Sequence, residues 1–312
     1  MGSTDDFAIN WRENADIRVN RDYSPLELLS LQDVHLQSGF NEKVYAKMLL
    51  DSRLILVNFA DKLCSAEIMS EFLPKNFLPV KANVLQDAND LESIDLPDEF
   101  FLKVNHGSGG LIGVSSRVKT GKFLPEVGLL KEWPRFLIGP DHFDKGRAIE
   151  HLNSWLGAKY RQESHYVREW CYSLIKPKMY VEQIVRDVNI IPPQMNIFCF
   201  HGKAMAFVYS DRRTDMKSFV RYIFLDNEGN FARICSRLSI GQWQTMIQAS
   251  EAVSQYTDMV RVDWLLASDG PIFSELTNYP YGGGMKFNST STRTPQEVDK
   301  ILSSYWGSIN SY

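Results

Sequence analysis

The chain has 312 residues, of which 44% are hydrophobic and 23% charged, and its formal net charge is -4. The length predicts about two domains, and the weakly acidic balance provides no basic surface for nucleic acid or anionic lipid. No apolar run approaches the ~20 residues that a membrane-spanning helix needs, and the N-terminal segment lacks the hydrophobic region of a signal peptide. The sequence therefore predicts a cytoplasmic protein that neither spans a membrane nor binds nucleic acid.

The cysteines are spread along the chain and form no metal-binding motif. They are Cys64, Cys171, Cys199 and Cys235, with no Cys-x-x-Cys spacing and no histidine pair at metal-ligand spacing. A zinc site is therefore not expected, and free thiols fit the reducing environment of the cytoplasm.

The first 95 residues are predicted to be mainly helical. Ser24 followed by Pro25 is typical of a helix N-cap with proline at the first helical position. Residues 42–50 and 60–73 are predicted as two further helices, and residues 53–58, with the sequence RLILVN, as a short strand between them.

Beyond residue 95 the composition changes to that of an α+β protein. Helices are predicted near 144–156 and 240–256, and a last helix begins at Thr294 with a capping box completed by Glu297. Residues 116–142 show no clear periodicity and are interpreted as a mobile segment. Strands are predicted for the segments rich in Val, Ile, Phe and Tyr, which are 99–105, 111–115, 178–186, 195–201, 204–210, 219–225, 259–266 and 271–276.

The stretch FFLKVNHGSGG, residues 100–110, places a lysine on an apolar strand and a glycine loop directly after it. Backbone N–H groups of a glycine loop can approach phosphate oxygens without side-chain obstruction, and Lys103 would supply positive charge to the same oxygens. A β-turn with an exposed lysine explains this segment equally well. The spacing matches neither the P-loop nor the dinucleotide-binding glycine motif, and His106 either contacts phosphate or packs the loop.

Two carboxylates occur on apolar strands that a turn at residues 268–270 joins into a hairpin. Antiparallel pairing would bring Asp263 and Glu275 to the same end of this hairpin, among apolar residues where an unpaired charge is costly. Two hard oxygen ligands close together suit Mg²⁺ that bridges phosphates. Arg261 lies two residues before Asp263 and would face the same side. The alternative is a structural ion pair between Arg261 and Asp263.

The strand KPKMYVEQIVRD, residues 176–187, carries Glu182 and ends on Arg186 and Asp187. Its backbone N–H and C=O groups could bind the edge of an adenine ring, and an acid just beyond it could bind ribose hydroxyls. An ordinary strand is the alternative for this segment taken alone.

Taken in chain order, these elements resemble the ATP-grasp superfamily, and more closely its TupA-like branch, which is linked to polysaccharide and teichuronopeptide biosynthesis. The order is a lysine, a glycine loop, a Val-Glu-x-x-Val hinge, Arg-x-Asp and a later Glu. The Lys-Val-Asn-His-Gly-Ser-Gly string is the most specific match. The matching segments are FADKL (59–63), LPDEFFLKVNHGSGG (96–110), LNSWL (152–156), REWCYSLIKPKMYVEQ (168–183), FCFHGKA (198–204), SDRR (210–213), VRVDWLL (260–266) and FSELTNYPYGGG (273–284).

The resemblance implies an ATP-grasp fold, in which two α+β subdomains sandwich ATP, preceded by a mainly helical N-terminal region. On this basis the N-terminal region is expected over residues 1–95. A subdomain with the glycine loop is expected over residues 96–181, and a subdomain with the metal site and the C-terminal helix over residues 182–312.

The resemblance also implies roles for individual residues, with ATP and Mg²⁺ as cofactors. Asp263 and Glu275 match the magnesium ligands. Arg261 and Lys103 would act in catalysis by neutralising charge on the transferred phosphate. The residues expected to bind the nucleotide are Lys62 and Lys103 at its phosphates, Gly107, Ser108, Gly109 and Gly110 in the closing loop, Glu182, Gln183 and Val185 at the adenine, and Asp187 at the ribose.

Some positions depart from the family pattern. Thr277 stands where many ATP-grasp enzymes have asparagine, and Asn278 lies beside it. Gln194 and Asn196 stand where TupA-like sequences often carry a charged pair, so that pair is missing here. Family members commonly continue with Phe-Thr-Pro where this chain reads TNYPYGGG, and the tyrosines of this segment are expected on the acceptor side.

The function that the resemblance implies is ATP- and Mg²⁺-dependent carboxylate–amine ligation. A substrate carboxylate attacks the γ-phosphate to give an acylphosphate and ADP, and an amine then attacks the acyl carbon to form an amide. The partners would be a small carboxylic acid and an amine, free or carried on a saccharide or peptide. An ATP-grasp kinase that phosphorylates a hydroxyl group, or a non-catalytic nucleotide-binding protein, is the alternative.

Overall fold

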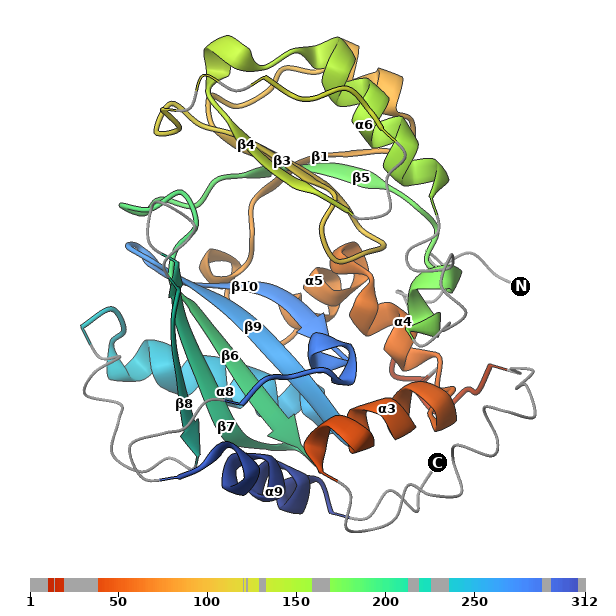
Figure 1. Cartoon of the computed structure of the whole chain (residues 1–312), viewed down its shortest axis with the longest axis vertical. Coiled ribbons are helices and arrows are strands. Elements are labelled where there is room, and N and C mark those ends of the chain that lie inside the picture. Colours follow the sequence, from red (N-terminus) through yellow and green to blue (C-terminus); the bar gives the residue numbers. More distant parts are fainter. Residues whose placement is uncertain are drawn as a thin grey trace.

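The structure is a computed structural model that describes residues 11–13, 15–19, 39–119, 121, 123–128, 133–158, 169–212, 219–225, 236–287 and 293–307. The described residues form two five-stranded sheets that face each other, with helices packed around them (Figure 1). This mixture of helices and sheets confirms the predicted α+β class.

The first sheet, in the upper part of Figure 1, has the strand order β1-β5-β2-β3-β4. Neighbouring strands pair antiparallel except for β3 and β4, which run parallel. Helix α6, Lys145–Gly157, covers the face that points away from the second sheet. The strands are β1 (Lys81–Leu85), β2 (Phe100–Val104), β3 (Leu111–Val114), β4 (Arg135–Ile138) and β5 (Met179–Gln183).

The second sheet has the order β10-β9-β6-β7-β8 and is antiparallel throughout. Side chains of α3, α4, α8 and α9 join its hydrophobic core. Its strands are β6 (Gln194–Phe200), β7 (Lys203–Arg212), β8 (Phe219–Leu225), β9 (Met259–Ala267) and β10 (Gly270–Thr277). The helices beside it are α3 (Phe40–Leu50), α4 (Ile55–Ala60), α5 (Lys62–Ser70), α8 (Ile240–Ser254) and α9 (Pro295–Trp306). Short 3₁₀ helices are η1 (Lys75–Phe77), η2 (Ala88–Ser93), η3 (Pro140–His142), η4 (Trp170–Leu174) and η5 (Pro280–Gly283).

The two faces of β2 explain why a lysine occurs on an apolar strand. Successive side chains of a strand point to opposite faces. Phe100, Leu102 and Val104 belong to the core beneath α6, whereas Phe101 and Lys103 line a cavity on the face toward the second sheet. Lys103 therefore reaches the space between the sheets without placing its charge in the core.

The prediction of a short strand at residues 53–58 is wrong, because helix α4 occupies Ile55–Ala60. Every residue of α4 is buried. A continuous apolar run has no polar face, so its periodicity cannot separate a buried strand from a buried helix. The predicted helices at 42–50 and 60–73 are confirmed by α3 and α5, whereas the helix predicted after Ser24 lies outside the described residues.

Two strands were not predicted from the sequence. Strand β1 lies in the region that was expected to be helical, and β4 lies in the segment interpreted as mobile. Because β1 pairs with β5, residues 81–85 belong to the same sheet as the glycine-loop strand. The domain boundaries stay predictions, and this pairing favours moving the first boundary toward residue 80.

A buried charged network lies between α3 and the start of β9. The Lys47 ammonium group donates hydrogen bonds to Asp51 at 3.0 Å and to Thr257 at 2.9 Å, and it also pairs with Asp258. Arg53 binds both oxygens of Asp51 at 2.8 and 2.5 Å. Both side chains of the Lys47–Asp51 pair are fully buried, so each charge depends on its partners for solvation.

Acidification is expected to remove the stability that Asp51 contributes. Burial alone would raise its pKa, but the charges of Lys47 and Arg53 hold the pKa of Asp51 well below its ordinary value. Such a carboxyl stabilises the fold above its unfolded-state pKa of about 3.9, and the stability is lost as the pH falls further. We expect the free energy of unfolding, measured with urea, to fall more steeply below about pH 4 in the wild type than in Asp51→Asn. Parallel pH profiles would contradict this role.

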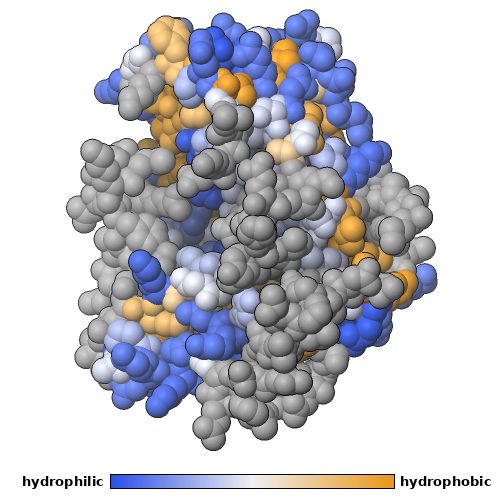
Figure 2. Space-filling view, turned by 45° about the vertical axis from the view of Figure 1, so that its right-hand side comes forward, coloured by the Kyte–Doolittle hydropathy of each residue, from blue (hydrophilic) through white to orange (hydrophobic). Residues whose placement is uncertain are grey.

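The described surface carries scattered hydrophobic residues rather than a continuous apolar face on the side shown in Figure 2, where small orange groups are separated by blue ones. The most exposed large hydrophobic side chains include Val188, Phe123 and Ile240, which lie in different parts of the chain. Single exposed apolar residues are normal on protein surfaces. Among the described helices, none has the length and apolar character required to cross a lipid bilayer.

Candidate active site

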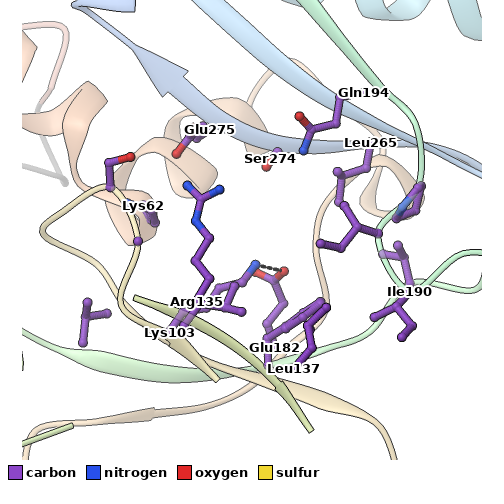
Figure 3. Close-up of a pocket in the computed structure, with 18 of the residues that line it drawn as sticks. Lys62, Lys103, Arg135, Leu137, Glu182, Ile190, Gln194, Leu265, Ser274 and Glu275 are labelled. Carbon is purple, nitrogen blue, oxygen red and sulfur yellow. Dashed lines mark hydrogen bonds and ion pairs between the residues drawn. The ribbon is translucent and has the colours of Figure 1, made fainter. Parts of the chain in front are cut away.

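Two cavities lined by described residues lie between the sheets. The first has a volume of about 160 Å³ and contains cationic side chains from α5, β2 and β4 together with apolar side chains from both sheets (Figure 3). Its lining residues are Lys62, Phe101, Lys103, Val104, Ser108, Gly109, Leu111, Arg135, Leu137, Tyr180, Glu182, Val185, Ile190, Ile191, Pro192, Gln194, Leu265, Ser274 and Glu275. An elongated ligand with a flat apolar part and an anionic part would find complementary surfaces here.

The second cavity, of about 280 Å³, adjoins the first and is lined mainly by polar side chains. Its lining includes Arg261, Asp263, Asn196 and Thr277 at the second sheet. The residues that line both cavities are Ser108, Arg135, Gln194, Ser274 and Glu275. These shared residues define a junction, so ligands in the two cavities would meet beside Glu275.

Lys103 on β2 lies opposite Tyr180 in the register with β5, and its side chain forms an ion pair with the diagonal neighbour Glu182. Tyr180, on the same face of β5, lines the first cavity beside them. On β1, Lys81 lies opposite Glu182 in the register, and burial lowers the pKa of Lys81 while Glu182 opposes that effect. The alternation of β5 predicts Tyr180 on the cavity face, but Lys81 was missed because β1 was not predicted.

Lys62 is the first residue of α5, and Asp61 forms the N-cap of this helix. The Asp61 carboxylate accepts hydrogen bonds from the backbone N–H groups of Leu63 at 2.8 Å and Cys64 at 3.4 Å. The Lys62 ammonium group donates to the carbonyl oxygen of Gly107 in the glycine loop. Burial lowers the pKa of Lys62, and the nearby charge of Glu275 acts in the opposite direction. The Asp61 cap therefore fixes the start of α5, and Lys62 at that start lies near both the glycine loop and the Glu275 carboxylate.

The glycine loop that follows β2 is held at its base by Asn105 and His106. The Asn105 side chain donates to Asp61 at 3.0 Å and accepts from the backbone N–H of Lys178 at 2.8 Å. The His106 ring is buried, approaches the carbonyl oxygen of Trp155 at 3.2 Å and packs edge-on against Trp133. Burial lowers the pKa of His106 to about 4, so at neutral pH it is an uncharged packing residue.

Gly109 is expected to tolerate no side chain. Its φ of +114° is a backbone conformation that favours glycine, and a Cβ there would overlap the carbonyl oxygen of Trp133. We expect Gly109→Ala to lower the free energy of unfolding, measured with urea, by about 1–3 kcal/mol. Gly128→Ala is the control, because a Cβ at Gly128 meets nothing within 4 Å and should change stability by less than about 0.5 kcal/mol. Equal stabilities for the two variants would contradict the strain described here.

Asp263 and Glu275 are cross-strand partners on β9 and β10, as the hairpin predicted. Val262 and Trp264 point into the core, which leaves Asp263 on the cavity face. A β-bulge between Phe273 and Glu275 interrupts the alternation of β10. Both Ser274 and Glu275 consequently line the junction of the cavities.

Arg261 binds both carboxylate oxygens of Asp263, at 2.7 and 2.6 Å. The ion pair that was the structural alternative is therefore present in this structure. The Arg261 guanidinium also donates to Thr277 at 3.2 Å and lies 5.2 Å from the ring centre of Tyr281. Both residues line the second cavity with Arg261, so the pair sits at the cavity surface and remains accessible to a ligand.

Burial and neighbouring charges shift the pKa values of the two carboxylates in opposite directions. Burial raises the pKa of Asp263 to about 6, and the charge of Glu275 adds to that effect while Arg261 opposes it. Burial would also raise the pKa of Glu275, but the charges of Lys62, Arg261 and Arg135 lower it. A pair of adjacent carboxylates is the donor set with which proteins bind Mg²⁺ together with substrate phosphates.

The residues predicted at the adenine and ribose are not all brought together. Val185 lines the first cavity with Glu182. Gln183 is exposed outside that lining, and its backbone N–H donates to the carbonyl oxygen of Val80 at 2.9 Å. Asp187 also lies outside the lining, where its carboxylate binds Arg237 at 2.9 Å. The geometry does not favour the predicted ribose role of Asp187.

The positions that depart from the family pattern can now be placed. Thr277 approaches Asp263 at 3.4 Å and lines the second cavity, whereas Asn278 is buried and donates to the carbonyl oxygen of Leu56 at 2.6 Å. Asn196 lies opposite Asp263 in the register of β6 and β9. The tyrosines expected on the acceptor side, Tyr279 and Tyr281, both line the second cavity.

Sequence reasoning missed Arg135, which lines both cavities. It also missed the apolar residues that follow the hinge, Ile190, Ile191 and Pro192, which contribute to the first cavity. Arg135 lies on a strand of only four residues, too short to show alternation. The apolar residues precede β6 in a loop, where no periodic pattern marks them.

Comparison with solved structures finds two ligases and a macrocyclase among the similar chains. D-alanine–D-alanine ligase from Bacillus anthracis is 12% identical, with a TM-score of 0.39, and covers 80% of this chain and 66% of its own. The ATP-grasp ligase PsnB, complexed with a phosphomimetic variant of a minimal precursor, Mg and ADP, is 9% identical with a TM-score of 0.42. This match covers 81% of the present chain and 61% of the PsnB chain. The macrocyclase MdnC from Microcystis aeruginosa MRC, bound with precursor peptide MdnA, is 10% identical with a TM-score of 0.38. This match covers 82% of the present chain and 63% of the MdnC chain. The match therefore spans about two thirds or less of each of these chains.

A family model provides the more specific finding. No curated protein sequence matches the chain. The family model described as TupA-like ATPgrasp matches residues 42–306, which include both sheets and both cavities. The match confirms the predicted fold, with helices α3–α5 preceding the first sheet. The chain belongs to the TupA-like ATP-grasp family.

Proposed function

We propose that the protein is an ATP- and Mg²⁺-dependent carboxylate–amine ligase that forms an amide bond and releases ADP. The observation that carries this proposal is the junction of the two cavities beside Glu275, with positively charged side chains around it. A ligase of this kind must hold a nucleotide and an acid next to each other, and the two adjoining cavities provide separate places for them.

The first cavity is the proposed nucleotide site. Its apolar end, with Val185, Ile190 and Leu265, suits the adenine ring, and its cationic end, with Lys62 and Lys103, suits the phosphates. The glycine loop would close over the phosphates through its backbone N–H groups. Glu182 would hold Lys103 in place through their ion pair.

The metal site is proposed at Asp263 and Glu275. When bound there, Mg²⁺ would neutralise charge on the phosphates and help to align them. Arg261, held by Asp263, would stabilise negative charge that develops on the transferred group. Lys62 would do the same from the first residue of α5.

The proposed reaction has two steps. A carboxylate oxygen of the acid bonds to the γ-phosphorus as the bond from that phosphorus to the β–γ bridging oxygen breaks, which yields an acylphosphate and ADP. The amine nitrogen then bonds to the acyl carbon, orthophosphate leaves, and the nitrogen loses a proton to solvent. The protein contributes positioning and charge stabilisation, and the closed glycine loop keeps water from the acylphosphate.

The second cavity is the proposed site for the acid and the amine. Its lining of hydroxyl, amide and carboxylate groups, including Ser210, Asn196 and Glu169, suits polar substrates that form several hydrogen bonds. The substrates are small acids and amines, free or carried on a saccharide or peptide.

An ADP-release screen against carboxylic acids and amines, followed by mass spectrometry of the products, tests the proposal. The expected result is ADP release that requires both an acid and an amine, with an amide as product. A phosphorylated alcohol as product would make the protein an ATP-grasp kinase. Nucleotide binding without turnover on any acid or hydroxyl compound would indicate a non-catalytic protein.

A further inference from the structure

Arg135 is the first residue of β4 and lines both cavities. Strand β4 runs parallel to β3, with Arg135 opposite Leu111 in the register. The Arg135 side chain extends from the first sheet toward Glu275 on the second sheet (Figure 3). Its charge contributes to the low pKa of Glu275, so the guanidinium lies within electrostatic reach of the proposed metal site.

The other cations around the junction already have partners. Lys103 is paired with Glu182, Lys62 with the carbonyl oxygen of Gly107, and Arg261 with both oxygens of Asp263. Within the part of the chain that the structure describes, the Arg135 guanidinium makes no hydrogen bond or ion pair, and the residue is exposed. Its planar fork of N–H donors is therefore available to an anion, and this geometry matches a phosphate or carboxylate group.

The position of Arg135 is tied to the glycine loop. Trp133, two residues earlier, packs edge-on against His106 with ring centres 5.0 Å apart. The ring and backbone of Trp133 also lie so close to Gly109 and Gly110 that a Cβ at either glycine would overlap them. Movement of the loop over a nucleotide would therefore displace the start of β4, and Arg135 with it.

We propose that Arg135 binds the γ-phosphate of the nucleotide from the side of the first sheet, opposite Arg261 and the carboxylate pair. This inference rests on the proposed ATP-dependent function and assigns a residue to the transferred group. The γ-phosphate is the anion expected beside Glu275, because the metal held there would bridge the terminal phosphates. The loop would supply backbone N–H groups to this phosphate, and Arg135 would supply positive charge.

The test compares the affinities of a nucleotide with and without the γ-phosphate. Calorimetric titration with Mg²⁺ measures binding of the non-hydrolysable ATP analogue AMPPNP and of ADP to the full chain. We expect Arg135→Gln to weaken AMPPNP binding roughly tenfold to a hundredfold, the range for a lost charge-assisted hydrogen bond, and to leave ADP binding unchanged. Arg135→Lys should fall between wild type and Arg135→Gln, because lysine keeps the charge but loses the fork.

Arg147→Gln is the matched control, because Arg147 lies on α6 and the one contact described for its guanidinium is with the exposed Glu150. It should leave both affinities unchanged. Thermal unfolding of each variant separates a binding effect from a folding defect.

Equal losses for AMPPNP and ADP, or no loss for either, would overturn the inference. Unchanged nucleotide affinities together with slower turnover would also overturn it, since Arg135 would then bind the carboxylate of the acid. Wild-type protein that binds neither nucleotide would overturn the proposed function as well. Binding of both nucleotides with an unchanged ratio in Arg135→Gln would contradict only the role of Arg135.

Discussion

Glu275→Gln is expected to lower kcat for ADP release on the order of a thousandfold. Glutamine keeps the size of the side chain but removes its charge, so Asp263 would hold the metal alone. The variant should also weaken Mg²⁺ binding, because this cation prefers charged oxygen ligands. The measurement is steady-state ADP release with a saturating acid and amine, over a range of Mg²⁺ concentrations.

Glu150→Gln is the control for this substitution, since Glu150 lies on the exposed surface of α6 with a side chain 56% exposed. It should retain wild-type turnover. Full turnover in Glu275→Gln at every Mg²⁺ concentration would show that the carboxylate pair is not the metal site.

Lys47→Met is expected to lower the free energy of unfolding by about 3–5 kcal/mol. The Lys47 side chain is fully buried, and its ammonium group binds Asp51, Thr257 and Asp258. Methionine fills similar space but leaves the two carboxylates with one cation fewer. Urea unfolding at neutral pH measures the loss.

Lys203→Met provides the matched control. Lys203 lies 3.9 Å from Glu251, and its side chain is 71% exposed. Exposed pairs of this kind contribute up to about 1 kcal/mol. Similar losses of stability in the two variants would contradict the structural importance of the buried network.

Much of the fold follows from local sequence patterns. The strands with alternating or apolar composition were predicted close to their observed positions, and the capping box at Thr294 begins α9 as expected. Alternation also explains Lys103 and Asp263, because a charged residue among apolar neighbours on a strand points away from the core. The order of these residues along the chain resembles that of the ATP-grasp superfamily, and this resemblance predicted that they belong to one site.

Other features depend on contacts that the sequence does not display. Helix α4 is buried on all sides, so its apolar run resembles a strand. Strand β4 is short and pairs in parallel with β3, and only the folded sheet brings Arg135 to the junction. The role of Asp187 was predicted from its place after the hinge, whereas its carboxylate is committed to Arg237.

The polar residues of the Lys-Val-Asn-His-Gly-Ser-Gly string have different roles in the structure. Lys103 faces the cavity, and Asn105 joins the loop to Asp61 and Lys178. His106 packs against Trp133 and has no ionic role at neutral pH. Residue type alone did not separate these tasks, because asparagine and histidine serve equally well as ligands and as structural hydrogen-bonding groups.

Transfer of labelled oxygen tests the central claim most directly. The acid found in the screen would be prepared with ¹⁸O in its carboxylate and incubated with ATP, Mg²⁺ and the amine. The account predicts orthophosphate that carries ¹⁸O from the acid, because an acylphosphate forms before the amide. Unlabelled orthophosphate accompanying amide formation, or a phosphorylated alcohol as the product of the active enzyme, would contradict it.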